Sequence, residues 1–93
     1  MLTTMLTAYP PIECNDGFTF SVQASSVWHC TPCNDEGPYT HVEVGFPNAS
    51  EPLLDAYFDN SKFIYINVPS ATVLAVIEKH GGIRSGELPP LSV

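Results

Sequence analysis

The chain has 93 residues, enough for one domain with one hydrophobic core and too few for a two-domain enzyme. Apolar residues make up 44% of the chain, as in globular domains, whereas charged residues make up only 14% against a usual value of about 25%. The net charge is −7, and the stretch from Met1 to Ser61 holds eight acids and no Lys or Arg. This layout argues against direct binding to nucleic acid or to an anionic membrane surface, since both need basic side chains. It favours a basic protein as partner.

The beginning of the chain does not have the pattern of a secretory signal. Residues 1–14 contain no basic region, and Thr3, Thr4 and Thr7 interrupt the apolar run. No stretch approaches the roughly 18 consecutive apolar residues of a membrane span. We therefore expect a cytoplasmic protein whose three cysteines are reduced thiols, because an odd number does not suit a disulfide framework.

Two segments in the first half of the chain alternate between apolar and polar residues, as half-buried strands do. One of them places Phe18, Phe20 and Val22 on a single face. The other places Val42 and Val44 on one face. The elements expected here are an extended segment at 1–16, a strand at 18–23, a short strand beginning at 27–28, a loop at 29–38 and a strand at 39–46.

The second half carries two helix signals and one strongly apolar run. Ser50 is followed by an acid and a proline, which is typical of a helix start. Ser70 precedes a second amphipathic stretch that ends at Gly81 and Gly82. The expected elements are a helix at 50–58, a strand at 63–68, a helix at 71–79 capped by Ser70 with Val73, Leu74 and Ile77 on its core face, and an extended tail at 83–93.

These elements predict a single α+β domain spanning residues 1–93. Its sheet is expected to be small, antiparallel or mixed, with three to four strands and two helices packed on one face. The segment 63–68 is apolar on both sides, which favours a central position in the sheet.

The most distinctive local pattern is the C-x-P-C pair formed by Cys30 and Cys33. It is similar to the redox motif of thioredoxins, but residues 34–38 cannot form the helix that lowers the pKa of such a thiol. Two other interpretations stay open. The main expectation is that the thiols pack in the protein without binding a cofactor. The alternative is a structural zinc site. The zinc alternative uses Cys14, Cys30, Cys33 and either His29 or His41.

The histidines do not belong to a recognisable hydrolase motif. The sequence contains no nucleophile elbow, no H-E-x-x-H helix and no glycine-rich phosphate loop. His80 is expected to act as a cation at the C-terminal end of its helix. His41 is expected to pair with Glu43 on the surface of a strand. We therefore expect no catalytic residues and no enzymatic activity.

Acidic and aromatic residues gather around the strand at 39–46. Aromatic side chains inside an acidic rim are typical of patches that bind Arg-rich or Lys-rich protein surfaces. The alternative is that Tyr39 only shields the edge of the sheet. The expected partner-binding residues are Asp35, Glu36, Tyr39, Glu43, Asp55 and Asp59.

Two segments, 37–47 (GPYTHVEVGFP) and 76–90 (VIEKHGGIRSGELPP), resemble small acidic proteins encoded by bacteriophages and prophages. The resemblance covers roughly residues 29–91 and comes with no assigned activity, so no binding residue is carried over from it. It implies a protein that works in the cytoplasm of a host cell by occluding a host protein, such as nucleic-acid-binding or defence machinery.

The sequence thus predicts a non-enzymatic binding protein whose acidic face docks on, and inhibits, a basic host protein. A small zinc-stabilised interaction module is the alternative. The low fraction of charged residues is also compatible with a homodimer that forms through the third strand or the neutral helix faces.

Overall fold

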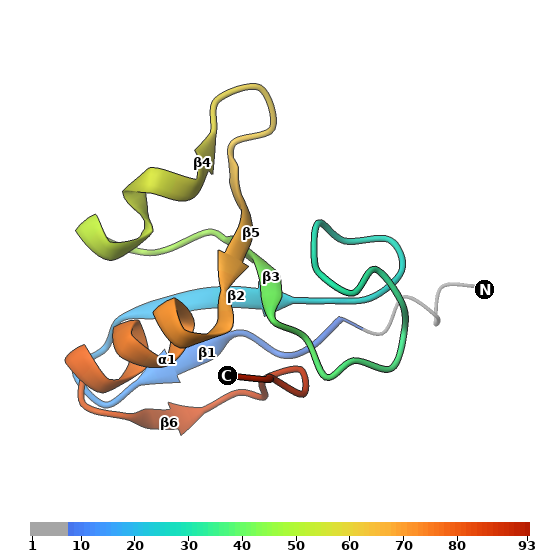
Figure 1. The fold of residues 1–93 in the computed structure, drawn as a ribbon. Coiled ribbons are helices and arrows are strands. Elements are labelled where there is room, and N and C mark those ends of the chain that lie inside the picture. Colours follow the sequence, from blue (N-terminus) through green and yellow to red (C-terminus); the bar gives the residue numbers. More distant parts are fainter. Residues whose placement is uncertain (1–7) are drawn as a thin grey trace.

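The computed structural model describes residues 8–93, in which one antiparallel sheet is covered by a single α-helix (Figure 1). The strands follow the order β4-β5-β3-β2-β1-β6 across the sheet. Their bounds are Ile12–Cys14 for β1, Thr19–Gln23 for β2, His41–Gly45 for β3, Phe58–Asp59 for β4, Ile64–Pro69 for β5 and Ile83–Ser85 for β6. The helices are the 3-10 helix η1, Pro52–Tyr57, and α1, Ser70–Lys79.

The predicted α+β fold, with three to four strands and two helices on one face, is wrong. The sheet has six strands, and α1 is the one α-helix in the described part of the chain. Strands β1, β4 and β6 have only two or three residues each, too few to display an alternating pattern in the sequence. They lie in segments that were expected to be extended ends or part of a helix and turn.

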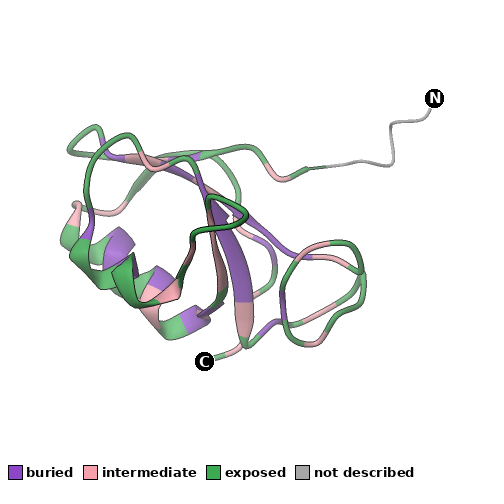
Figure 2. Cartoon of the chain, turned by 90° about the horizontal axis from the view of Figure 1, so that it is seen from above, coloured by how far each residue is buried: buried purple, intermediate pink, exposed green. Residues whose placement is uncertain are grey.

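The two alternating segments do form strands, and these two strands pair at the centre of the sheet. In β2, Phe20 and Val22 are fully buried beneath α1, as the alternation predicts. In β3, Val42, Glu43 and Val44 are all buried, so both faces of this strand are covered. Figure 2 shows this pattern, with buried positions concentrated in the strands and along one side of the helix.

The apolar segment predicted at 63–68 forms β5, but it does not lie at the centre. It pairs with β3 on one side and with the two-residue strand β4 on the other. Because β4 is so short, most of β5 is only half-buried. No strand forms at Val27 and Trp28, since Trp28 N donates to Ser25 O and closes a turn.

Helix α1 forms where it was predicted, but its start and its buried face differ. The Ser70 hydroxyl donates 2.6 Å to the carbonyl oxygen of Tyr39 and does not cap the helix. Val73, Val76 and Ile77 face the core, whereas Leu74 is 39% exposed. These buried positions follow the i, i+3, i+4 spacing of one helical face, in which Leu74 has no place.

The segment predicted as a helix at 50–58 forms η1, a 3-10 helix, and its cap is not Ser50. Glu51 is the N-cap, and its side chain accepts from the backbone N–H of Leu53 at 3.0 Å. Leu54 is buried beneath this turn, and Phe58 leads directly into β4.

The tail lies along the body of the domain. Strand β6 pairs with β1, after which Glu87 N donates to Pro10 O. Farther along, Tyr39 N donates to Pro90 O and Ser92 N donates to Tyr39 O. The tail therefore lies first beside β1 and then beside Tyr39, just before β3.

We expect Gly86→Ala to lower the free energy of unfolding by about 2 kcal/mol, as measured by urea denaturation. Gly86 has φ +102°, and a Cβ atom there would overlap the carbonyl oxygen of Pro11. Gly17→Ala is the matched control, because Gly17 has φ +96° and open space around the Cβ position. It should cost about 1 kcal/mol, from backbone strain alone. Equal losses in the two variants would contradict the docking of the tail on β1.

Candidate binding pocket

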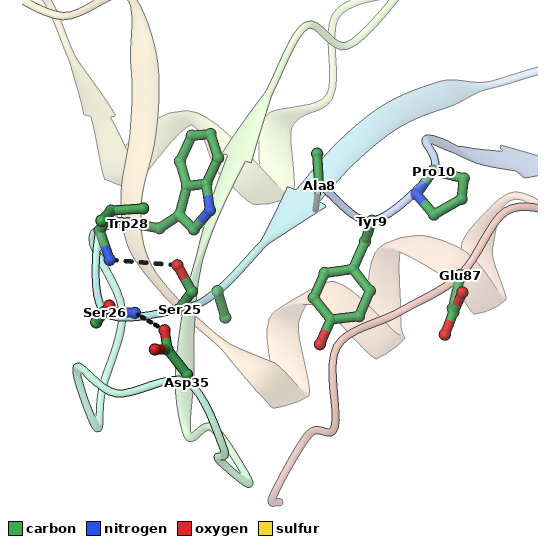
Figure 3. A pocket seen from close by; sticks show the side chains of 10 residues that line it. Ala8, Tyr9, Pro10, Ser25, Ser26, Trp28, Asp35 and Glu87 are labelled. Carbon is green, nitrogen blue, oxygen red and sulfur yellow. Dashed lines mark hydrogen bonds between the residues drawn. The ribbon is translucent and has the colours of Figure 1, made fainter. Parts of the chain in front are cut away.

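A pocket of about 1200 Å³ opens where the segment before β1, the turn after β2 and the tail after β6 come together (Figure 3). Aromatic rings and carboxylates both line it. Its lining residues are Ala8, Tyr9, Pro10, Ala24, Ser25, Ser26, Val27, Trp28, Asp35 and Glu87.

The buried amide of Gln23 holds Tyr9 in place at this pocket. Tyr9 N donates to Gln23 Oε1 at 2.8 Å, and Gln23 Nε2 donates to Tyr9 O at 2.7 Å. Gln23 is the last residue of β2 and is only 6% exposed, so its buried side chain attaches the segment before β1 to the sheet. These bonds hold the backbone of Tyr9, and its ring lies between the turn after β2 and the tail (Figure 3).

The opposite wall is a compact turn that carries Trp28 and is fastened to Asp35. Trp28 N donates to Ser25 O at 3.2 Å, and Ser26 N donates to Asp35 Oδ1 at 2.8 Å. The bonds from Ser26 hold the pKa of the Asp35 carboxyl below its usual value, so Asp35 is ionised at neutral pH.

The pocket suits a cation. Asp35 and Glu87 supply two carboxylates, Tyr9 and Trp28 supply two rings, and no Lys, Arg or His is among the described lining residues. A guanidinium or ammonium group is attracted both by carboxylates and by the face of an aromatic ring.

The structure separates the acidic residues that were expected to form one face. Asp35 lies at the pocket and Glu36 follows it in the same exposed loop. Asp59 lies on β4, the edge strand, which β5 and β3 separate from β2 and the pocket. Asp55 lies on η1, which leads directly into β4. Asp59 also accepts from Ser61 N and Lys62 N, so it closes its own turn.

Two of the expected contact residues are buried. Tyr39 is 1% exposed, and its hydroxyl donates to Asn34 O at 2.7 Å. Glu43 is 7% exposed and accepts from both the backbone N–H and the Nδ1 of His29, at 3.0 and 2.8 Å. The predicted pair of His41 with Glu43 is wrong, since His41 Nδ1 lies 2.8 Å from Thr40 Oγ1. Tyr39 and Glu43 therefore hold the loop at 29–38 onto the sheet.

The four residues of the zinc alternative do not come together. Cys14 N donates to Phe18 O just before β2 begins, whereas Cys30 Sγ donates to Ser25 O beyond the end of the same strand. Among residues 8–93 no group of three or more His, Cys, Asp or Glu side chains is placed to hold a metal ion.

A charged cluster that the sequence did not reveal links the turn between β1 and β2, the N-cap of η1 and the end of α1 through His80. The Nε2 of His80 lies 2.6 Å from Glu51 Oε1, and its Nδ1 lies 2.6 Å from Asp16 Oδ2. The Lys79 ammonium lies 2.9 Å from Glu51 Oε2, and the imidazole stacks on Phe18 with 4.1 Å between the ring centroids. Both ring nitrogens face carboxylates, and both can donate only in the imidazolium form. His80 is therefore a structural cation with no nitrogen free to act as a base.

The pKa values in this cluster follow from its geometry. Burial of Glu51 opposes its ionisation, but hydrogen bonds from Leu53, Lys79 and His80 outweigh this and hold its pKa at about 2. Hydrogen bonds to Glu51 and then to Asp16 raise the pKa of His80 above its usual value. The hydrogen bond from Phe18 N, followed by that from His80, lowers the pKa of Asp16.

These shifts predict a stability maximum between about pH 4.5 and pH 6.5. The lowered pKa of Glu51 contributes stability above 4.5, on the order of 3 kcal/mol, which is lost as the pH falls toward 2. The raised pKa of His80 contributes stability below 6.5, which is lost as the pH rises through the folded value. Melting temperatures measured between about pH 3 and pH 9 should show both limbs. In His80→Gln the alkaline limb should disappear, and an unchanged alkaline limb would contradict the role of His80.

A second exposed surface lies at the far end of β3 and β5. Phe46 and Phe63 are 83% and 76% exposed, with φ of 52° and 58°. The pairing of Val44 with Tyr65 places their backbone positions across from each other, just beyond the paired residues. Neither Phe46 nor Phe63 lines the pocket. No feature of the structure beside these two rings identifies a partner that would cover them.

No helix among residues 8–93 is long and apolar enough to cross a membrane. Comparison of the chain with protein-family models, with curated proteins and with solved structures found no match.

Sequence reasoning missed three of the four residues that give the pocket its chemistry. Of these it singled out only Asp35, while Tyr9, Trp28 and Glu87 lie at positions 9, 28 and 87 of the chain. The single tryptophan, set in a Ser-rich turn, was the one available signal. Neither the anchoring of Tyr9 by Gln23 nor the return of the tail to Pro10 is encoded in a local pattern.

Proposed function

We propose that this protein is a non-enzymatic binding protein that docks on a basic partner protein through the pocket at Tyr9 and Trp28. The pocket takes an Arg or Lys side chain of the partner, between the two rings and beside the carboxylates of Asp35 and Glu87. The observation that carries the proposal is that two carboxylates and two rings from separate segments line one pocket, with no basic residue among its described lining residues.

The distribution of charge over the whole chain supports this proposal. Of the three basic side chains, Lys79 pairs with Glu51, and Arg84 pairs with Glu13 at 2.7 Å. The third, Lys62, lies close enough to Asp59 for its charge to lower the pKa of that carboxyl, so none of the three is among the described lining residues of the pocket. An uncompensated acidic site steers basic partners toward itself and raises their rate of association.

The resemblance to phage-encoded proteins would make the partner a host protein, and inhibition of that host protein would follow from occupying its basic surface. This part of the proposal rests on the resemblance and on the acidity of the chain. Its readout is the identity of the protein that the domain captures from bacterial lysate at low salt and releases at high salt.

A fluorescence titration tests the docking step directly, because Trp28 is the only tryptophan in the chain. The probe is a short peptide of alternating arginine and glycine, and the control peptide carries uncharged citrulline in place of arginine. Trp28 emission should change with the arginine peptide, and its affinity should fall about threefold when the ionic strength rises from about 50 to about 300 mM. Equal binding of the citrulline peptide, or no binding of either, would refute the proposal.

A further inference from the structure

Two thiols lie directly behind the wall of the pocket that carries Trp28. Cys30 Sγ donates to the carbonyl oxygen of Ser25 at 3.0 Å, and Cys33 Sγ donates to that of Ser26 at 3.4 Å. Ser25 and Ser26 are consecutive and both line the pocket. Both thiols therefore lie at the pocket wall, and Cys33 is near enough to Cys30 to raise the pKa of its thiol.

The two thiols differ in their access to solvent. Cys30 is buried at 7% exposure, whereas Cys33 is exposed. Burial raises the pKa of Cys30, and the neighbouring Cys33 thiol adds to this shift. Cys33 is thus the thiol that a reagent in solution reaches first, and Cys30 is placed to react second.

Each thiol uses its S–H proton to hold the turn from Ser25 to Trp28. A disulfide has no such proton, so its formation removes the donors to the carbonyls of Ser25 and Ser26. The turn would then lose the bonds that fix it from behind, while Ser26 N remains bound to Asp35 in front.

We propose that Cys30 and Cys33 form a reversible dithiol–disulfide site that controls the shape of the pocket through the turn that carries Trp28. The reduced pair holds the binding-competent pocket, and the oxidised pair weakens the binding of a cationic side chain. The effect on binding rests on the proposed function, whereas the formation of the disulfide does not.

The oxidant is a small-molecule disulfide such as oxidised glutathione. The Cys33 thiolate attacks one of its sulfurs, forming a mixed disulfide and expelling one glutathione thiolate, which takes up the proton that Cys33 lost. The Cys30 thiolate then attacks the Cys33 sulfur, forms the internal disulfide and expels the second glutathione. Two protein thiols are oxidised, and one disulfide is reduced to two thiols.

The oxidation state of the thiols and the affinity of the pocket are thermodynamically coupled. A ligand that binds the reduced protein more tightly must therefore also stabilise the dithiol against oxidation. If oxidation weakens binding of the arginine peptide tenfold, saturating peptide should raise the reduction potential of the pair by about 30 mV. This shift is measurable in glutathione redox buffers.

The experiment incubates the full chain with excess oxidised glutathione and measures free thiols, mass and Trp28 emission without any peptide. The thiol count should fall from the three of the reduced chain to one, since Cys14 is buried and separate. The mass should fall by about 2 Da, and Trp28 emission should shift. Peptide binding should then weaken by at least about threefold and recover fully on reduction.

Three variants separate the steps. In Cys30→Ser, Cys33 should stop at the mixed disulfide with glutathione, which identifies it as the attacking thiol. Cys33→Ser keeps a hydroxyl donor for Ser26 O, so it should retain the emission of the reduced protein and resist oxidation. Cys33→Ala removes that donor without adding a crosslink, and should move Trp28 emission in the direction seen on oxidation.

A thiol count that stays at three would overturn the redox site. A disulfide that forms without a change in Trp28 emission or in peptide affinity would overturn its control of the pocket. If the reduced chain fails to bind the arginine peptide, the proposed function fails, while thiol count and emission still report on the disulfide and the turn.

Discussion

Replacing Glu51 with glutamine is expected to lower the free energy of unfolding by about 3 kcal/mol near pH 6. Glu51 is 2% exposed and receives hydrogen bonds from Leu53 N, Lys79 and His80. The neutral amide keeps the size of the side chain but removes the charge that compensates the two cations. It also turns an amide N–H₂ group toward one of these donors, which leaves that donor unsatisfied.

Urea denaturation measures this loss, and Glu78→Gln is the matched control because Glu78 is an exposed acid on α1, next to Lys79. That control should change stability by no more than about 0.5 kcal/mol. The difference between wild type and Glu51→Gln should also shrink as the pH falls from 4.5 toward 2, since Glu51 then becomes neutral in the wild type. A loss that is small, or that is the same at every pH, would contradict the charged cluster.

The double variant Asp35→Asn with Glu87→Gln is expected to weaken binding of the arginine peptide about tenfold. Both substitutions keep shape and remove charge, so the rings of Tyr9 and Trp28 stay in place and only the electrostatic attraction is lost. Most of the salt dependence of binding should disappear with it.

The control for the double variant removes the same amount of charge elsewhere. Asp55→Asn with Glu78→Gln changes two exposed acids that do not line the pocket. Its affinity for the arginine peptide should stay within about twofold of the wild type, because exposed charges beyond the Debye length are screened. Equal weakening by the two double variants would mean that net charge drives binding and that the pocket does not.

The predictable part of the fold is the part governed by local periodicity. The alternation of Phe18, Phe20 and Val22 located β2, and the run that ends at Gly81 located α1. Strands β1 and β6 were missed because each has three residues and exists only by pairing with another segment. Their register depends on contacts between opposite ends of the chain, and such contacts leave no local pattern in the sequence.

The roles of Tyr39 and Glu43 show where alternation misleads. A strand with alternating apolar and polar residues is expected to expose its polar face to solvent. The alternation therefore predicted that Tyr39 and Glu43 are exposed. The loop at 29–38 and the tail after β6 cover that face, through the bonds of His29 to Glu43 and of Tyr39 to Pro90 and Ser92. Segments without secondary structure thus bury the second face of β3, which the alternation predicts to be exposed.

The charged cluster was unpredictable for a related reason. His80 was assigned to the end of α1 correctly, but its partner Asp16 lies 64 residues away and Glu51 lies 29 away. Glu51 was interpreted as an acid in the first turn of a helix, when it is the buried cap of η1. Only the packing of η1 beside the end of α1 brings these groups together.

The most direct test of the binding pocket is a map of amide and indole chemical shifts in the ¹⁵N-labelled, reduced chain titrated with the arginine peptide. We expect the largest changes at Tyr9, Ser26, Trp28, Asp35 and Glu87, and we expect the citrulline peptide to leave these signals unchanged. Changes centred on Phe46 and Phe63, or spread evenly over the exposed acids, would contradict the proposed binding pocket.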